Sequence, residues 1–188
     1  SAQLRGPAGS PAEAVSRVVV GVLGVIAIRR DEDMIALPVL AHFGEQDAMI
    51  PLAARRGAAL AWEYYFDFGG GRPPWTSGMS QATGIQALAR ATRRLGETVY
   101  LETARRALPL FEQAPPLGVR QSTSAGARYL IYSYAPGLHV VNAAVQTLVG
   151  LFDYAEFTGE TTARELFRAG LQAWCYRRSL KLSGFATN

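Results

Sequence analysis

A glycine followed by an acidic residue occurs three times in this sequence, and the repetition constrains the fold more than any other feature. The three turns read Phe43-Gly44-Glu45, Leu95-Gly96-Glu97 and Thr158-Gly159-Glu160. Segments with helical periodicity flank each turn, and glycine just past a helix end commonly adopts the left-handed cap conformation. The sequence therefore predicts three helical hairpins, with the two helices of the first hairpin over 34–43 and 49–62.

The spacing of the turns bears on how the hairpins assemble. Their glycines lie 52 and 63 residues apart, from 44 to 96 and from 96 to 159, which is too uneven for a TPR or ankyrin array. Hairpins joined by long loops are typical of an (α/α) toroid, in which functional loops gather at one mouth of the ring. We predict an all-α, six-hairpin-like domain over 17–188, incomplete because three hairpins do not close such a ring. Residues 1–16 are expected to form a disordered leader.

A short apolar run over 18–28 precedes the first predicted hairpin. It contains five valines and two isoleucines, and it is interrupted by Gly21 and Gly24, which favours a small N-terminal strand or hairpin. The run falls short of the roughly 20 residues that span a bilayer, and no small-residue cleavage site follows it. We therefore expect neither a membrane span nor a signal peptide. The single cysteine, Cys175, forms no internal disulfide and leaves the compartment undetermined.

The charge of the chain narrows the classes of ligand. It has 18 arginines and one lysine against 15 acidic residues, a formal net charge of +4. Guanidinium groups suit carboxylate ligands, although a genome rich in arginine codons explains this composition more simply. The arginines form no stripe and no basic run is interleaved with aromatic residues, which argues against nucleic-acid binding. With two histidines and no clustered acids, neither a metal site nor another cofactor is expected.

Two long loops between the predicted hairpins, over 64–77 and 115–136, are the expected places for function. In the first loop three consecutive glycines precede Arg72 and Trp75, and a tryptophan ring offers sugars an apolar stacking face. Arg72 and Trp75 suit a functional or a structural role equally well. The aromatic residues before them are predicted to anchor the core: Trp62, Phe66 and Phe68.

The second loop is rich in tyrosine, with Tyr129, Tyr132 and Tyr134 alternating with apolar neighbours. Such a series is also consistent with a packed edge strand. Asn142, at the predicted start of the next helix, is expected either to cap that helix or to hydrogen-bond a sugar. His139 is more typical of a structural histidine than of an acid–base group.

An ordered set of motifs across about 35–178 resembles the C-terminal domain of D-glucuronyl C5-epimerases. The matching stretches include the aromatic-Asp-Phe-Gly segment near Asp67, Trp75-Thr-Ser-Gly-Met-Ser-Gln81, Gly118-Val119-Arg120, Pro136 with Val141-Asn142, and Leu148-Val-Gly-Leu-Phe-Asp-Tyr154. The resemblance implies a toroid that inverts C5 of uronate residues in an acidic polysaccharide or oligosaccharide. Removal of the C5 proton, which is α to a carboxylate, develops negative charge that cations or donors must stabilise. Inversion also requires an acid–base group on each face of the sugar.

The resemblance assigns site residues by position. Tyr132 corresponds to the second tyrosine of a Tyr-acid-acid-Tyr motif in the family, and it inherits the catalytic role there. Tyr129 and Tyr134 are the further catalytic candidates, while Leu130 and Ile131 replace the acid pair. The expected substrate-binding residues are Arg72, Trp75, Gln81, Arg120, Asn142 and His139.

Two other functions remain open on the sequence. A polysaccharide lyase begins with the same proton removal, and a non-catalytic glycan-binding or scaffolding toroid requires none. The missing acid pair favours the second alternative, as does the lack of a counterpart after Tyr176 for the family's further catalytic tyrosines. Open toroid edges would expose apolar helix faces, so a homodimer is also predicted.

Overall fold

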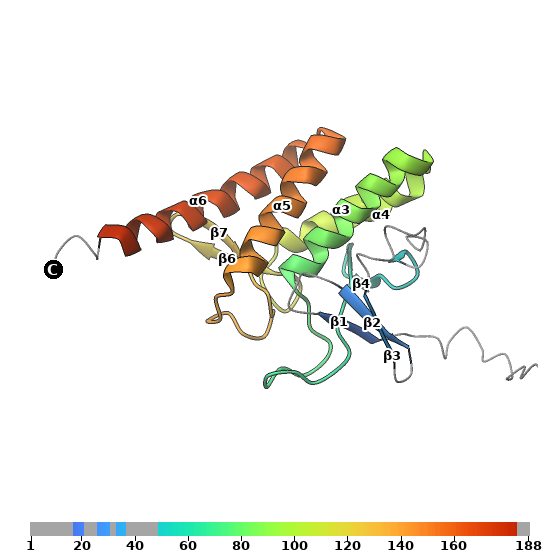
Figure 1. The fold of residues 1–188 in the computed structure, drawn as a ribbon, viewed down its shortest axis with the longest axis horizontal. Helices are drawn as coiled ribbons and strands as arrows, with labels where there is room; N and C mark the ends of the chain where they lie inside the picture. Colours follow the sequence, from blue (N-terminus) through green and yellow to red (C-terminus); the bar gives the residue numbers. More distant parts are fainter. Residues whose placement is uncertain (1–16, 21–25, 31–32, 37–48, 184–188) are drawn as a thin grey trace, which may run out of the picture.

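The computed structural model describes residues 17–20, 26–30, 33–36 and 49–183. This part of the chain is mostly helical, with small antiparallel strand pairs (Figure 1). Its helices are α3 (Gly78–Leu95), α4 (Thr98–Ala107), the 3₁₀-helix η1 (Leu108–Phe111), α5 (Val141–Thr158) and α6 (Thr161–Ser183). Its strands are β1 (Arg17–Val20), β2 (Ile26–Arg30), β3 (Asp33–Ala36), β4 (Ala54–Arg56), β5 (Ala59–Ala61), β6 (Arg120–Thr123) and β7 (Gly126–Tyr129).

Two of the three predicted helical hairpins are confirmed. The α3/α4 turn places Gly96 at φ 78°, and its N–H donates to the Thr92 carbonyl at 2.8 Å. The α5/α6 turn places Gly159 at φ 73°, and its N–H donates to the Ala155 carbonyl at 2.9 Å. Both glycines therefore form the left-handed caps that the sequence predicts. The turn at Gly44 lies outside the described residues.

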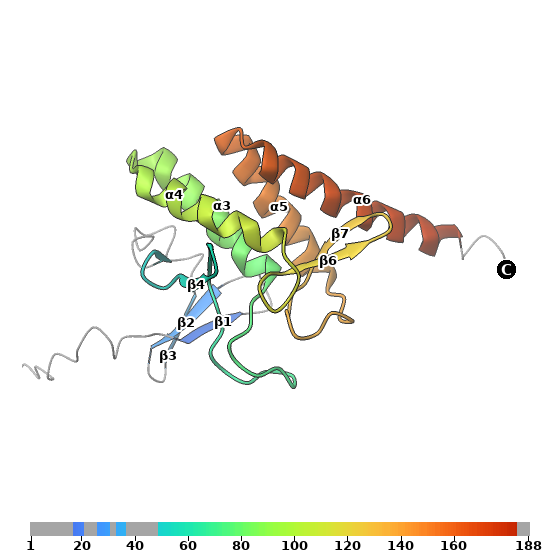
Figure 2. The ribbon, with the colours of Figure 1, turned by 180° about the vertical axis from the view of Figure 1, so that it is seen from behind.

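The two hairpins pack together through α3 and α5, which lie side by side in both views of the ribbon (Figures 1 and 2). The helices approach so closely that a Cβ on Gly150 would lie 2.6 Å from the Ala82 carbonyl oxygen. Ile85 and Leu88 of α3 and Leu151 of α5 are fully buried in the core that this pair forms. Near their N-terminal ends, Met79 of α3 and Ala143 of α5 belong to one small apolar cluster. The long loops before these helices are therefore held at the same end of the helix pair.

The first predicted helical hairpin is wrong. Residues 54–61 form the antiparallel pair β4–β5, with Arg56 opposite Ala59 and Gly57 at φ 61° in the two-residue turn. Such turns require positive φ, which glycine adopts readily, and this turn chemistry outweighs the helical preference of the surrounding alanines. Residues 33–36 are likewise strand β3, and residues 37–43 lie outside the described part. The all-α expectation is corrected to a mostly helical fold with strands.

The predicted N-terminal hairpin is confirmed. Strands β1 and β2 pair antiparallel with Val18 opposite Ile28, and β3 extends them to a three-stranded sheet in the order β1-β2-β3. The leader predicted over 1–16 lies outside the described residues. No helix in the described part combines the length and the apolar character that crossing a bilayer requires.

Candidate functional site

The two loops that the sequence singles out meet at one end of the helix pair. The first loop folds back on itself, because Tyr64 and Trp75 exchange backbone hydrogen bonds of 2.8 and 3.2 Å. It joins the second loop through two further bonds, in which the Thr76 N–H donates to the Ser133 hydroxyl and the Ser133 N–H to the Thr76 carbonyl, each at 3.0 Å. The Gly78 N–H also donates to the Leu130 carbonyl at 2.7 Å. The backbone therefore fixes the position of the second loop against the first.

The side chains of the two loops form one aromatic cluster centred on Trp75. The Trp75 ring stacks on Tyr64 with centroids 4.0 Å apart, and its edge contacts Tyr132 and Tyr134 at 5.6 and 5.5 Å. Trp75 is only 2% exposed, and its indole N–H donates to the Phe66 carbonyl at 2.9 Å. Trp75 therefore supports the junction from inside, and its faces are covered by protein.

Tyr132 lies half-buried in this cluster. Its ring contacts Phe68 at 5.5 Å and stacks on Tyr134 at 5.6 Å, with 24° between the two planes. The Tyr134 hydroxyl donates to the Phe68 carbonyl at 2.6 Å, and burial raises the pKa of Tyr134. Gly71 is required here because the Tyr134 ring fills the space of a Cβ, with ring atoms 2.2 to 2.4 Å from that position. The glycine-rich tip of the first loop thus accommodates the Tyr134 ring of the second loop.

Tyr129 points away from this cluster. Its ring packs edge-on against Phe111 at 5.4 Å, and its hydroxyl donates to the Leu166 carbonyl in α6 at 2.7 Å. Burial raises the pKa of Tyr129, although the charge of Arg120 opposes the shift. This half-buried phenol, neutral and hydrogen-bonded, holds β7 to α6, and it is poorly suited to accept a proton.

The other predicted site residues are spread over the described part. Gln81 is fully buried: the Trp62 N–H donates to its Oε1 at 3.0 Å, and its Nε2 donates to the Trp62 carbonyl at 2.7 Å. Arg72 is exposed and directly follows the glycine-rich tip, three residues before Trp75 in the sequence. Asn142 is exposed as the second residue of α5, whose N-cap is Val140, so the capping prediction for Asn142 is wrong.

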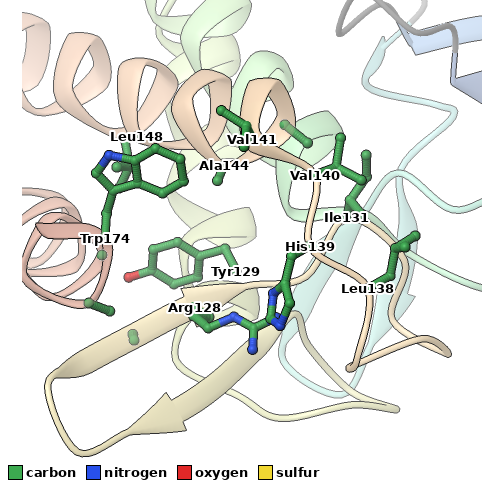
Figure 3. A pocket seen from close by; sticks show the side chains of 14 residues that line it. Arg128, Tyr129, Ile131, Leu138, His139, Val140, Val141, Ala144, Leu148 and Trp174 are labelled. Carbon is green, nitrogen blue, oxygen red and sulfur yellow. The ribbon is translucent and has the colours of Figure 1, made fainter. Parts of the chain in front are cut away.

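A pocket of about 330 Å³ lies next to the second loop (Figure 3). Its walls are the start of α5, the middle of α6, strand β7 and residues 138–140. Tyr129, Leu148 and Trp174 line its interior, and Arg128 and His139 line its edge. Of the predicted site residues, Tyr129 and His139 thus face this pocket, whereas Tyr132, Tyr134 and Trp75 belong to the aromatic cluster.

A buried ion pair beside the first loop escaped the sequence analysis. The Arg56 guanidinium binds the Glu63 carboxylate, and the two side chains are 13% and 7% exposed. Arg56 also donates to the Pro116 carbonyl, which ties strand β4 to the loop before β6. The Tyr65 hydroxyl donates to Glu63 at 2.8 Å, and burial together with this carboxylate raises the pKa of Tyr65 to about 12. No motif or periodicity in the sequence connects these residues.

Within the described residues, no group of three or more His, Cys, Asp or Glu side chains is placed to hold a metal ion. The chemistry that the junction offers is that of phenol hydroxyls, aromatic faces and nearby guanidinium groups.

Comparison with known proteins identifies a family and a curated relative. The family described as D-glucuronyl C5-epimerase C-terminus matches residues 56–179. The D-glucuronyl C5-epimerase of Caenorhabditis elegans is 32% identical over 114 residues, an alignment that covers 54% of this chain. The same alignment covers 18% of the length of the nematode protein.

Proposed function

Because this chain belongs to the D-glucuronyl C5-epimerase C-terminal family, we propose that it acts in C5 epimerisation of uronate residues within an acidic polysaccharide. The observation that carries the proposal is the junction of the two aromatic loops, where Tyr132 packs against Phe68 and Trp75. The resemblance to the family assigns the catalytic role to this tyrosine. In our proposal the two packed hairpins belong to an (α/α) toroid, and this junction lies at the mouth of the ring.

In the proposed reaction Tyr132 moves the C5 proton. A tyrosinate accepts this proton from one face of the sugar, and the electrons of the broken C–H bond pass into the adjacent carboxylate as an enolate-like anion. Delivery of a proton to C5 from the opposite face inverts the centre, and delivery from the same face restores it. Arg72, exposed after the glycine-rich tip, is our candidate to stabilise the carboxylate charge, since guanidinium pairs well with carboxylates.

Tyr134 is assigned a positioning role in this scheme. A sugar between two rings needs a separation of about 7 Å, twice a van der Waals contact of about 3.5 Å. The Tyr132 and Tyr134 centroids are 5.6 Å apart, so no sugar fits between these rings. With its hydroxyl donating to Phe68, Tyr134 instead holds the Tyr132 ring in place. The group that serves the opposite face of the sugar must then come from outside this stacked pair.

A non-catalytic glycan-binding role is the second candidate. It is favoured by Leu130 and Ile131 in place of the family's acid pair, both of which are buried and supply no charge. A domain with such a junction would bind the polysaccharide without exchanging its C5 proton.

One experiment separates these functions. The protein is incubated with a uronate polysaccharide in heavy water, and deuterium at C5 is measured by NMR together with absorbance from unsaturated uronate. The proposal predicts deuterium at C5 without new absorbance. New absorbance would identify a lyase, and saturable polysaccharide binding without deuterium uptake would identify the glycan-binding alternative.

A further inference from the structure

The pocket between α5, α6 and β7 has a lining that differs in kind from the aromatic junction. Most of its wall is aliphatic, with Ile131, Leu138, Val140 and Leu148 among the contributors. Its volume of about 330 Å³ is within the range of roughly 300–1,000 Å³ that is typical of small-molecule sites. Such a wall favours the apolar body of a small ligand.

The polar groups of the pocket are few, and they suit a single anionic group. Among the residues that line it are Arg128 and His139 but no aspartate or glutamate. The Arg128 guanidinium is anchored by a hydrogen bond of 3.2 Å from Nη2 to the Pro136 carbonyl, and Figure 3 shows Arg128 and His139 at the same edge of the pocket. A cation fixed at the rim of an apolar cavity is complementary to a carboxylate attached to an apolar chain.

A sugar is a poorer match for this lining. Each sugar hydroxyl that enters an apolar cavity needs a hydrogen-bond partner to offset the loss of water. Among the side chains that line the pocket, only those of Arg128, Tyr129, His139 and Trp174 carry polar groups, and the Tyr129 hydroxyl already donates to the Leu166 carbonyl. The lining side chains thus offer few partners for a ring that bears several hydroxyls.

We propose that this pocket binds a small organic anion with an aliphatic body, of the class of medium-chain carboxylates. The chain lies among the apolar side chains of α5, α6 and Ile131, and the carboxylate lies at Arg128. The wall of the pocket includes Ile131, which precedes Tyr132 in the second loop. A bound ligand would therefore contact a residue adjacent to Tyr132. The proposal does not depend on the epimerase activity.

Calorimetric titration with hexanoate, octanoate and decanoate tests the proposal, with decan-1-ol as the uncharged probe. We expect affinity to rise two- to fourfold for each added methylene, because a buried methylene contributes about 0.8 kcal/mol. Arg128→Gln should weaken decanoate about tenfold and leave decanol binding unchanged, which also shows that the pocket has kept its shape. Arg168→Gln, which removes an exposed arginine from α6 outside the pocket wall, is the matched control and should bind decanoate as wild type does.

Binding is located without a variant by NMR, where decanoate should shift the Trp174 indole N–H and the Leu148 methyl signals. Saturable binding that is equal for decanoate and decanol, or no binding at all, would overturn the proposal. Displacement of decanoate by a uronate oligosaccharide would assign the pocket to sugar instead. If decanoate binding is lost at concentrations where the chain self-associates, the pocket would instead be assigned to contact with a second copy of the chain.

Discussion

Replacing Gln81 by methionine tests whether this residue is a structural clamp, as its geometry indicates, and not the sugar ligand that the sequence suggested. The Gln81 amide binds both backbone groups of Trp62, in the manner of a neighbouring strand, at 3.0 and 2.7 Å. Both residues are fully buried, so water cannot replace these bonds. Methionine has nearly the same shape but offers neither the donor nor the acceptor.

The expected loss of stability arises because the substitution leaves two buried backbone groups of Trp62 without hydrogen-bond partners. A buried polar group without its partner costs about 1–3 kcal/mol, and methionine recovers a small part of this through its apolar surface. We therefore expect Gln81→Met to lower the free energy of unfolding by about 2–4 kcal/mol. For a chain of this size the melting temperature should fall by about 5–15 °C.

The assay is urea unfolding followed by circular dichroism, with Gln121→Met as the matched control. Oε1 of Gln121 is buried without a hydrogen-bond partner in the described part of the chain, so replacing that amide breaks no hydrogen bond of Oε1 and should leave the protein at least as stable as wild type. A Gln81→Met protein as stable as wild type would refute the clamp.

Three further predictions concern the packing around the two loops. Gly150→Val should destabilise the protein by about 2–3 kcal/mol in urea unfolding, because its side chain would collide with the backbone of α3. Tyr129→Phe should cost about 1 kcal/mol through loss of the hydrogen bond to the Leu166 carbonyl and leave any C5 exchange within threefold of wild type. The neutral Tyr65 phenol is favoured by burial and Glu63, so its stabilising effect is complete below its unfolded pKa of about 10 and is lost as pH rises through about 12. Absorbance titration should show one phenol near pH 12 that Tyr65→Phe removes.

The sequence predicted those parts of the fold in which a local signal and the tertiary structure agree. Gly96 and Gly159 each follow a helix, and each turn forms as expected. The alanine-rich stretch before Trp62 predicts a helix only through the intrinsic preference of alanine. Strands form here instead because Gly57 allows a two-residue turn and because Trp62 pairs with Gln81. That pairing is a tertiary contact, and sequence periodicity cannot reveal it.

The candidate site was predicted as a meeting of two loops, and the loops do meet. The sequence could not tell which aromatic residues would face the junction, because neighbours along an irregular loop point in different directions. Tyr129 and Tyr132 are three residues apart, yet the first binds α6 and the second packs on Phe68. Trp75 has the aromatic ring that is typical of a sugar-stacking platform, but the ring is buried like that of a core residue.

Self-association remains a prediction. Val145, Val149 and Phe152 leave an exposed apolar stripe along α5, each more than 40% exposed. Sedimentation of the protein over a range of concentrations would measure whether two copies pair.

The rate of deuterium incorporation at C5, compared between Tyr132→Phe and Tyr134→Phe, tests the central assignment most directly. General acid–base groups contribute about 10²–10⁴-fold to a rate, so Tyr132→Phe should lose at least about a hundredfold. Tyr134→Phe removes only a hydroxyl that holds the neighbouring ring, and it should lose less than about tenfold. Wild-type exchange in the Tyr132→Phe protein would contradict the assignment.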